Sequence, residues 1–521
     1  MVDAHWVNND EGAHLMDSWL VTLGLIPEVD FDSREPLYVM LYLPVIWLDG
    51  GYRLARFVPV LCTFASALVL RDLCRTFEPS GRMGVLASLL FLYSPTVLMN
   101  TAVVKTEPPA ILLSCLSIWA YSRFQTSQKL RWLFCSGVVA GAGYYIRESA
   151  LAIFVTVLIL LIYQERQPKG ILVFLAGWSS VVGLVMGIYS RWMSWSSMVA
   201  SAEIFPLSAV FQAVGKILNW GSRSSGGARA SDQPWMETTR QFVEPVLMNQ
   251  GILVAALLFV MASLGRSNAS PWKRRCSYVA VLWLGITTLL YGYHTVNHGY
   301  YQYYFRELLP PVCLLAAAGL MSWGKSQRSL LQGLAVLLVA AVLFGFVFSA
   351  PSLTVAVIAS AVTSVGLSAL FWFKGWPLRS GLLLGTFLAG SLYAGAQTGL
   401  SYNCPFPPST VRQVSRFLSD HTETDDEILS GAVIWEFQAR RRPLGNWAHP
   451  LSLLIRGHGQ DQWEQSFTQD PPAAMVLDKT MQKIFFPRFS QVEETLKKDY
   501  YRAATYGQVE IFLRKDRELS K

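Results

Sequence analysis

Long apolar runs separated by short polar connections make up most of the chain. A run needs roughly 17 to 25 residues to cross about 30 Å of hydrocarbon, and fewer where protein neighbours shield it. By that rule the sequence predicts about twelve membrane-spanning helices. They are expected at 57–74, 84–104, 108–122, 132–146, 149–163, 171–190, 250–265, 277–294, 308–323, 329–349, 352–373 and 380–399.

Basic residues occur in alternate connections, and this pattern predicts the orientation of the spans. One set of connections carries two to four Lys or Arg residues each, whereas the short connections of the other set hold only Lys105, Arg147 and Arg306. Because basic loops stay in the cytoplasm, the second set is expected to face outward. The segment around residue 10, a long loop at 191–249 and the C-terminal tail then lie outside as well.

Two of the runs, 132–146 and 149–163, are short and flank Arg147 and Glu148. They form either two short spans or a re-entrant pair, which leaves both ends on one side of the membrane. The alternation of basic loops holds only if 149–163 is a separate span, so it favours two short spans.

The composition is typical of a polytopic membrane protein. Of the 521 residues, 52% are hydrophobic and 15% are charged, and the mean hydropathy is +0.33. The net charge of +8 belongs largely to the predicted cytoplasmic loops, and no basic patch with interleaved aromatic residues indicates nucleic-acid binding. The seven cysteines show no paired spacing, so we expect them to be reduced.

The composition changes near residue 401, which predicts a small soluble domain at 401–521. A helix is expected from about Ser409, where VRQVSRFL places apolar residues on one face, and another at QVEETLKKDY. The runs DEILSG, AAMVLD and QVEIFLRK are typical of strands. The sequence therefore predicts an extracytoplasmic α/β domain, in which the arginines of RRRPLGNW form a solvated basic turn or meet lipid phosphates.

Three parts follow from this division: a first external loop with juxtamembrane helices at 1–56, a transmembrane domain at 57–400 and the soluble domain at 401–521. The opening MVDAHWVNND lacks the basic n-region and apolar h-region of a signal peptide. An external N-terminal segment normally follows a first hydrophobic helix. We therefore expect that this first helix is either encoded upstream of Met1, which would bring the number of spans to about thirteen, or has been lost.

Chemistry is expected on the outer face, where four segments are unusually polar. They are NNDEGAH with the following DFDSREPL, VVKTEPPA, the pair Arg147-Glu148, and YHTVNHGYYQYYFRELLPP. The first precedes an amphipathic stretch that is expected to lie along the membrane interface. The prolines of the second suit the first turn of a helix.

Each segment also has a plainer explanation. Arg147 and Glu148 can form structural ion pairs or anchor a helix end. His294 and His298 stand four residues apart, as metal ligands on one helix face do, but no third ligand stands nearby. The tyrosines around Tyr303 form an aromatic belt or a platform for a sugar. The acidic pair near the N-terminus can be solvated charge.

Together the segments suit a transfer reaction at the lipid boundary. A carboxylate takes the proton from an attacking acceptor hydroxyl, cations stabilise a departing phosphate, and aromatic faces bind a sugar and a lipid chain. The candidate carboxylates are Asp10, Glu11 and Glu107. The candidate cations are Arg34, Lys105, Arg147 and Arg306.

The order of these motifs resembles that of the C-type glycosyltransferases that use polyprenyl-phosphate sugars, including protein O-mannosyltransferases and the aminoarabinose transferases of lipid A. NDEGAHLM is similar to the Asp-Glu motif of the first external loop, and REPLYVMLYLP to the Lys-Pro-Pro-Leu segment. TEPPAILL is similar to the second acidic motif, AGAGYYIRESAL to the Gly-rich span that closes on a basic residue, YYFRELLPPV to the late external segment, and VEIFLRK to the closing strand. The resemblance spans essentially the whole chain. Glu35 departs from it by replacing the first proline of its motif, and Glu107 by standing where Asp is common.

The resemblance implies roles for individual residues. Asp10 is expected to be the catalytic base, with Glu11 and Glu107 positioning acceptor or donor or helping to hold a divalent ion. Arg34 and Arg147 are expected to face the donor phosphate. Lys105 and Arg306 are further candidates for the phosphate, and His294, His298 and Tyr303 are candidates for substrate binding.

We therefore predict a multi-pass enzyme of a bacterial-type plasma membrane, with its active site on the extracytoplasmic face. It would transfer a sugar, with inversion, from a polyprenyl-phosphate carrier to a protein, lipid or cell-envelope glycan. No cofactor is required by the sequence, and a divalent metal ion (Mg²⁺ or Mn²⁺) is left open. The alternatives are a secondary transporter, although no two related halves appear, and a noncatalytic scaffold for envelope assembly.

Overall fold

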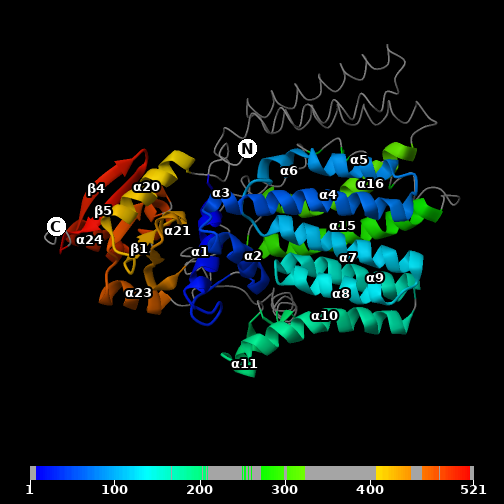
Figure 1. The fold of residues 1–521 in the computed structure, drawn as a ribbon, viewed down its shortest axis with the longest axis horizontal. Coiled ribbons are helices and arrows are strands. Elements are labelled where there is room, and N and C mark those ends of the chain that lie inside the picture. Colours follow the sequence, from blue (N-terminus) through cyan, green and yellow to red (C-terminus); the bar gives the residue numbers. More distant parts are fainter. Residues whose placement is uncertain are drawn as a thin grey trace, which may run out of the picture.

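The computed structural model describes residues 7–322 and 406–516, apart from 34, 166, 202–203, 207, 209–248, 250–251, 254–255, 257–259, 261–270, 299–301, 448–459, 480 and 488. A helical bundle and a small α/β unit lie at opposite ends of the molecule, with α1 and α2 between them (Figure 1). The predicted spans at 329–349, 352–373 and 380–399 lie outside the described residues, as does Cys404. The six other cysteines are unpaired.

Helices make up the N-terminal part. Those before the bundle core are α1 (Asn9–Thr22), α2 (Pro36–Trp47) and α3 (Tyr52–Ala55). The bundle follows with α4 (Phe57–Phe77), α5 (Arg82–Leu92), α6 (Pro95–Asn100), α7 (Glu107–Ser127), α8 (Arg131–Tyr144), η1 (Glu148–Ala150), α9 (Leu151–Leu160), η2 (Leu161–Glu165), α10 (Pro168–Tyr189), α11 (Trp195–Ala200), α15 (Pro271–His298), η4 (Gln302–Leu308) and α16 (Leu309–Ser322).

Two of the described helices are long and apolar enough to cross a membrane by length and composition. They are Tyr52–Phe77, which joins α3 and α4, and Pro168–Tyr189, which is α10. Shorter apolar helices occur at Pro36–Trp47, Arg82–Leu92 and Glu148–Gln164. The predicted number of about twelve spans is therefore not established by the described part of the chain.

The predicted span at 84–104 is wrong as a continuous helix. The structure breaks it into α5 and α6 at Ser94, whose φ of −55° and ψ of 128° lie outside the helical region. Proline at position 95 causes the break, because its ring disfavours the helical conformation of the residue before it and itself suits the first turn of a new helix.

Glycines bring α8 and α10 into close contact. A β-carbon on Gly137 would overlap the carbonyl oxygen of Phe174, and one on Gly177 would overlap the carbonyl oxygen of Phe134. The two helices therefore approach each other through reciprocal glycines, a packing common between helices in membranes. Helices α8 and α9 are separate and pack against each other, and Arg147 lies in the turn between them.

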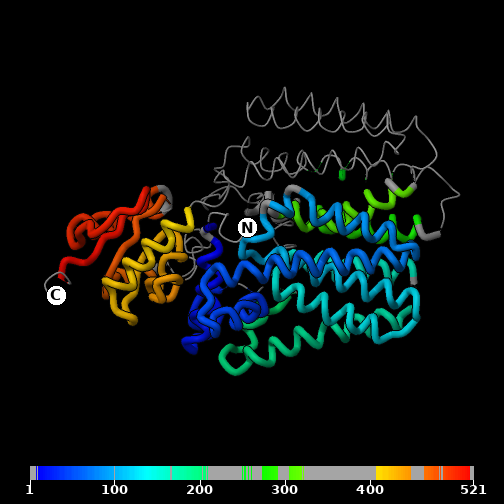
Figure 2. The backbone as a smooth tube through the Cα atoms, turned by 45° about the horizontal axis from the view of Figure 1, so that its top comes forward, coloured from blue at the N-terminus to red at the C-terminus, as the bar shows by residue number. Residues whose placement is uncertain are grey.

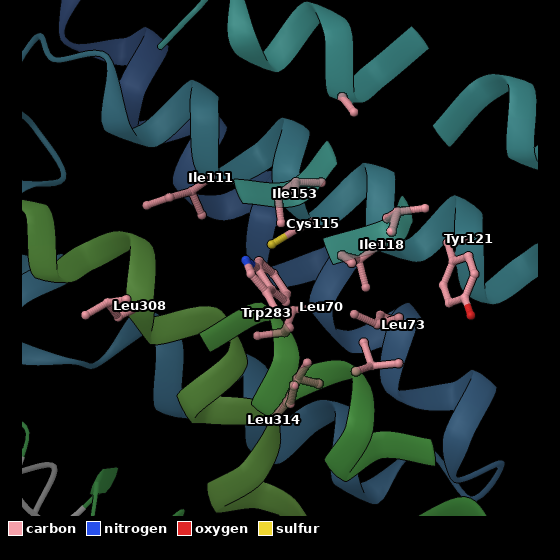
Figure 3. Close-up of a cluster of buried hydrophobic side chains, with 14 of the residues drawn as sticks. Leu70, Leu73, Ile111, Cys115, Ile118, Tyr121, Ile153, Trp283, Leu308 and Leu314 are labelled. Carbon is pink, nitrogen blue, oxygen red and sulfur yellow. The ribbon is translucent and has the colours of Figure 1, made fainter. Parts of the chain in front are cut away.

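The core of the bundle is apolar and continuous. Trp283 of α15 lies close to Cys115 of α7, with Ile111 and Ile153 beside them and Leu314 of α16 below (Figure 3). Burial of such side chains is worth about 1.5 to 3 kcal/mol each in water, but in lipid the gain comes mostly from close packing.

The C-terminal unit contains α20 (Pro408–His421), β1 (Glu427–Ser430), α21 (Ile434–Ala439), β2 (Arg442–Pro443), η5 (Leu444–Asn446), α23 (Gln460–Gln469), β3 (Ala474–Leu477), η6 (Met481–Phe485), α24 (Ser490–Asp499), β4 (Tyr500–Tyr506) and β5 (Val509–Arg514). Its sheet has the strand order β2-β1-β3-β5-β4. Strands β2, β1 and β3 are parallel, whereas β5 runs antiparallel to both β3 and β4. Helix α20 starts at Pro408 without a side-chain cap, so the expected cap at Ser409 is wrong.

The two faces of this sheet belong to different apolar clusters, because side chains alternate along each strand. Ile428 and Val476 face a cluster that also contains Leu15 and Met16 of α1. The side chains that follow or precede them along β1 and β3 face a second apolar cluster, which is built around Trp463 of α23. One face of the sheet therefore shares a core with the helix that carries the acidic motif, and both views show α1 next to this unit (Figures 1 and 2).

The arginines of RRRPLGNW do not form the expected solvated turn. Arg441 is buried and donates to the carbonyl oxygens of Ser419 and Thr422, so it satisfies the C-terminal end of α20. Arg440 forms an ion pair with Asp49 at 2.7 Å, which links the C-terminal unit to the loop after α2.

Candidate active site

The acidic motif opens a helix and is not part of a flexible loop. Asn8 is the N-cap of α1, and its side-chain oxygen accepts a hydrogen bond from the backbone N–H of Asp10 at 2.8 Å. In return the backbone N–H of Asn8 donates to Oε1 of Glu11 at 2.9 Å. This reciprocal arrangement is a capping box, which fixes the first turn of α1 and thereby the direction of both acidic side chains.

Glu11 is completely buried and engaged on both carboxylate oxygens. Arg56, at the start of α4, donates from Nε at 2.8 Å and from Nη2 at 2.7 Å. The backbone N–H of Val104 donates to Oε2 at 3.2 Å. Because protein donors occupy both oxygens, we interpret Glu11 as the residue that ties α1 to α4 and to the segment before α7, not as a group that meets substrate.

Asp10 projects from the same turn but remains accessible. Its carboxylate forms an ion pair with the ammonium group of Lys105, and 39% of the Asp10 side chain is exposed compared with 4% for Lys105. The hydrogen bond from Val104 to Glu11 holds the chain next to Lys105 against α1. The structure therefore brings together a carboxylate and a cation that stand in separate segments of the sequence.

Glu107, the first residue of α7, links two arginines. Its Oε1 lies 2.9 Å from Nη1 of Arg147, and its Oε2 lies 3.1 Å from Nη2 of Arg306. Pro108 and Pro109 occupy the first turn of α7, as predicted, where their missing N–H groups cost nothing. Glu107 thus joins the α8–α9 turn to η4, which are far apart in the sequence.

Glu307 completes this network, and the sequence interpretation gave it no role. Its Oε1 lies 2.8 Å from Nε of Arg147, and Ser149 donates to its Oε2 at 2.8 Å. The signal that points to Glu307 is its position next to Arg306 in the Tyr-rich external segment. A buried carboxylate rarely stands alone, so a glutamate in this segment is expected to have a basic partner, which the structure shows to be Arg147.

The guanidinium of Arg147 is held along one edge. Nη1 and Nε bind the two glutamates, Thr106 and Ser149, and the guanidinium lies 4.9 Å from the centre of the Tyr304 ring. Among the described residues, none accepts a hydrogen bond from Nη2, and 16% of the side chain is exposed. A guanidinium that is fixed on one edge and open on the other is suited to binding an anion.

Comparison with known proteins places this geometry in a known architecture. The family model described as dolichyl-phosphate-mannose-protein mannosyltransferase matches residues 48–195. The crystal structure of ArnT from Cupriavidus metallidurans bound to undecaprenyl phosphate superimposes with a TM-score of 0.60 at 13% identity, covering 98% of this chain and 94% of that one. The fold is that of the C-type glycosyltransferases. The fold that the sequence motifs imply is thereby confirmed.

A second structure of the same ArnT, in the apo state, superimposes on this chain equally well. The TM-score is 0.60 at 12% identity, covering 98% of this chain and 94% of that one. No curated protein matches the sequence. The segment matched by the family model contains Lys105, Glu107 and Arg147 but not Asp10.

The structure does not describe the side chains of four of the predicted site residues. Arg34 lies outside the described residues, and so do the side chains of His294, His298 and Tyr303. The backbone nevertheless constrains the surroundings of Arg34. Its neighbour Glu35 accepts a hydrogen bond from the backbone N–H of Glu148 at 3.3 Å, so the start of α2 lies against the α8–α9 turn.

The described carboxylates do not fit a resident metal ion. No group of three or more His, Cys, Asp or Glu side chains converges in a way that could hold one, within the ranges that the structure describes. Glu11, Glu107 and Glu307 face arginines, and Asp10 faces Lys105. A divalent cation would have to displace these positive groups, so we derive no step through a metal ion.

Proposed function

We propose that this protein is a membrane glycosyltransferase that moves a sugar from a polyprenyl-phosphate carrier to an acceptor hydroxyl on the extracytoplasmic face of a bacterial-type plasma membrane. The observation that carries the proposal is the exposed carboxylate of Asp10 paired with Lys105, two residues before the Glu107 that holds Arg147 and Arg306. A candidate base and candidate phosphate-binding cations thus converge from three segments.

The architecture supports a lipid-linked donor. ArnT from Cupriavidus metallidurans, which shares the fold, was solved with undecaprenyl phosphate bound. The description of the matching family model names a dolichyl-phosphate sugar. Both carriers are polyprenyl phosphates, so a donor of that chemical class suits a site that combines cations with buried apolar helices.

The cations act on the leaving group. A sugar joined to a polyprenyl phosphate carries one negative charge on the phosphate, and a second develops as the bond between the anomeric carbon and the phosphate oxygen breaks. Arg147, whose guanidinium is fixed along its other edge, donates from Nη2 to the phosphate that bears this charge. Lys105 and Arg306 are further donors. Preorganised cations of this kind lower the barrier because they do not have to reorient during the reaction.

Asp10 acts on the acceptor. Its carboxylate accepts the proton of the acceptor hydroxyl while that oxygen forms the new bond to the anomeric carbon. The polyprenyl phosphate departs with the electron pair of the broken bond. Because the attack opposes the departing phosphate, the transfer inverts the anomeric configuration. An incoming phosphate competes with Asp10 for Lys105, so donor binding releases the carboxylate to meet the acceptor.

The proposal is tested with the purified protein in liposomes and a series of radiolabelled polyprenyl-phosphate sugars. Release of the sugar to water or its transfer to an acceptor fraction supports the enzyme. Accumulation of intact, unreacted substrate inside the vesicles would indicate a secondary transporter instead. Binding with neither reaction nor uptake would leave a noncatalytic scaffold and reject the proposed reaction.

A further inference from the structure

The C-terminal unit (406–516) contacts the chain on both sides of Asp10. Three residues before Asp10, Val7 pairs with Phe406 in an antiparallel bridge, in which the N–H of Val7 donates to the carbonyl of Phe406 at 2.8 Å and the N–H of Phe406 returns a bond at 3.4 Å. Two residues after Asp10, Gly12 lies against the first residue of α21. The base is therefore held between two contacts with the same unit.

The contact at Gly12 leaves no room for a side chain. A β-carbon at this position would overlap the backbone nitrogen of Ile434 and stand 2.5 Å from its Cα. These are backbone atoms of a short helix packed on a sheet, so they cannot rotate away as the end of a side chain can. Any larger residue at position 12 must push α1 away from α21.

The apolar packing around this contact is shared. Leu15 and Met16, on the following turn of α1, belong to the same buried cluster as Ile434 and Trp435 of α21. A displacement at Gly12 therefore moves the start of α1 as a body. Figure 1 shows α1 lying between the C-terminal unit and the helical bundle.

The two arginines of the proposed phosphate site are held by other elements. Arg147 is bound by Thr106, Glu107, Ser149 and Glu307, and Arg306 by Glu107 and the carbonyl of Asn100, all of them in the helical bundle. The base and these cations are thus positioned from two sides: the base by α1 and the C-terminal unit, and the cations by the bundle.

We propose that the C-terminal unit is a positioning element of the transfer reaction, and that Val7 and Gly12 are the positioning residues through which it sets the place of Asp10. This inference rests on the proposed role of Asp10 as the base. A shift of about 1 Å in a reacting group costs about 100-fold in rate. Arg147 and Arg306 keep their partners in the bundle, so phosphate binding by these two arginines does not depend on α1, whereas Lys105 pairs with Asp10 itself.

The test compares Gly12→Ala with Gly187→Ala, a matched control in α10 where an added β-carbon meets nothing within 4 Å. The turnover number, the KM of the donor and the affinity for polyprenyl phosphate are measured on equal amounts of folded protein. We expect Gly12→Ala to lower the turnover number about 100-fold and to change the affinity for polyprenyl phosphate far less, because Arg147 and Arg306 stay in place. Gly187→Ala should match the wild type in all three.

A milder variant guards against misfolding of Gly12→Ala. Val7→Pro removes the N–H that donates to Phe406 without adding bulk at α21. It should lower the turnover number less than Gly12→Ala and also leave polyprenyl phosphate binding intact.

The outcomes separate this inference from the proposed function. Full turnover in both variants overturns the positioning role, and so does an equal loss of turnover and phosphate affinity, which would indicate general disruption of the site. A wild-type protein that binds the donor but never transfers its sugar overturns the proposed function itself, and this inference falls with it.

Discussion

Asp10 and Lys105 form an ion pair although 95 residues separate them in the chain. Asp10 stands in the first turn of α1, whereas Lys105 stands two residues before α7, and Glu11 holds the two segments together through Val104. The pair joins the candidate base to the network of Glu107, Arg147 and Arg306. In the proposed reaction, a donor phosphate replaces Asp10 as the partner of Lys105.

The side of the membrane on which this pair lies is a first prediction. An accessibility tag inserted before Val7 should react with a membrane-impermeant reagent added to intact cells, because alternate basic loops place this end of the molecule outside. The same tag in the loop between α4 and α5, which is flanked by Arg75 and Arg82, should react only after the membrane is opened. Labelling of the first tag only in opened cells would refute the extracytoplasmic site.

Glu11 is predicted to matter for folding more than for chemistry. Glu11→Gln removes the carboxylate charge from the buried pair with Arg56, and breaking a buried pair in this way costs about 3 to 5 kcal/mol. Thermal unfolding in detergent should show a clear drop in the midpoint. The exposed pair Glu493–Lys497 gives a control, since Glu493→Gln should change stability by less than about 0.5 kcal/mol. Equal effects of the two changes would argue against a structural role for Glu11.

Arg147→Lys is predicted to weaken donor binding despite keeping the charge. Lysine cannot hold Glu107 and Glu307 on one edge and still offer a second nitrogen to a phosphate. The affinity for polyprenyl phosphate should fall about tenfold or more, measured by calorimetry in detergent. Arg123→Lys, at a partly exposed pair with Asp72, is the control and should bind normally. Unchanged affinity in Arg147→Lys would place the phosphate elsewhere.

The C-terminal unit should show a pH-dependent stability that arises from Glu436. Burial raises the pKa of this carboxyl to about 8, and the nearby Asp478 raises it further, whereas Ser430 opposes the shift. Because the folded pKa lies above the unfolded value, the unfolded state releases its proton first. Stability should therefore fall by about 1.4 kcal/mol per pH unit as the pH rises between the unfolded and folded values.

Glu436→Gln mimics the neutral acid, so it should remove this loss. Its melting temperature should exceed that of the wild type at pH 8 and approach it near pH 5. Parallel pH profiles for the two proteins would show that Glu436 does not titrate as described.

Local patterns in the sequence predicted much of the fold. The proline pair placed the start of α7, and β1, β3 and β5 fall on the three segments that were predicted as strands. The break at Ser94 was missed because a long apolar run outweighed a single proline, although that proline carried the signal. Element types depend on neighbours in the chain, and for that reason they can be predicted without a structure.

The partners inside the site depend on contacts across long stretches of chain. Nothing near Glu11 indicates that Arg56 neutralises it, and nothing near Glu107 indicates that it binds two arginines. The motifs pointed to groups that the structure brings into contact, such as Asp10 with Lys105 and Glu107 with Arg147, but could not separate the groups that hold these segments together from those that remain accessible. Arg441, which caps α20, shows the same limit.

The most direct test is the rate of sugar transfer by Asp10→Asn, measured with a radiolabelled polyprenyl-phosphate sugar. Asparagine preserves the size of the side chain but cannot accept the proton of the acceptor, so transfer should fall about 100-fold or more while folding and polyprenyl phosphate binding persist. Asp420→Asn, an exposed position on α20, should transfer at the wild-type rate. Transfer by Asp10→Asn at the wild-type rate would contradict the assignment of Asp10 as the base.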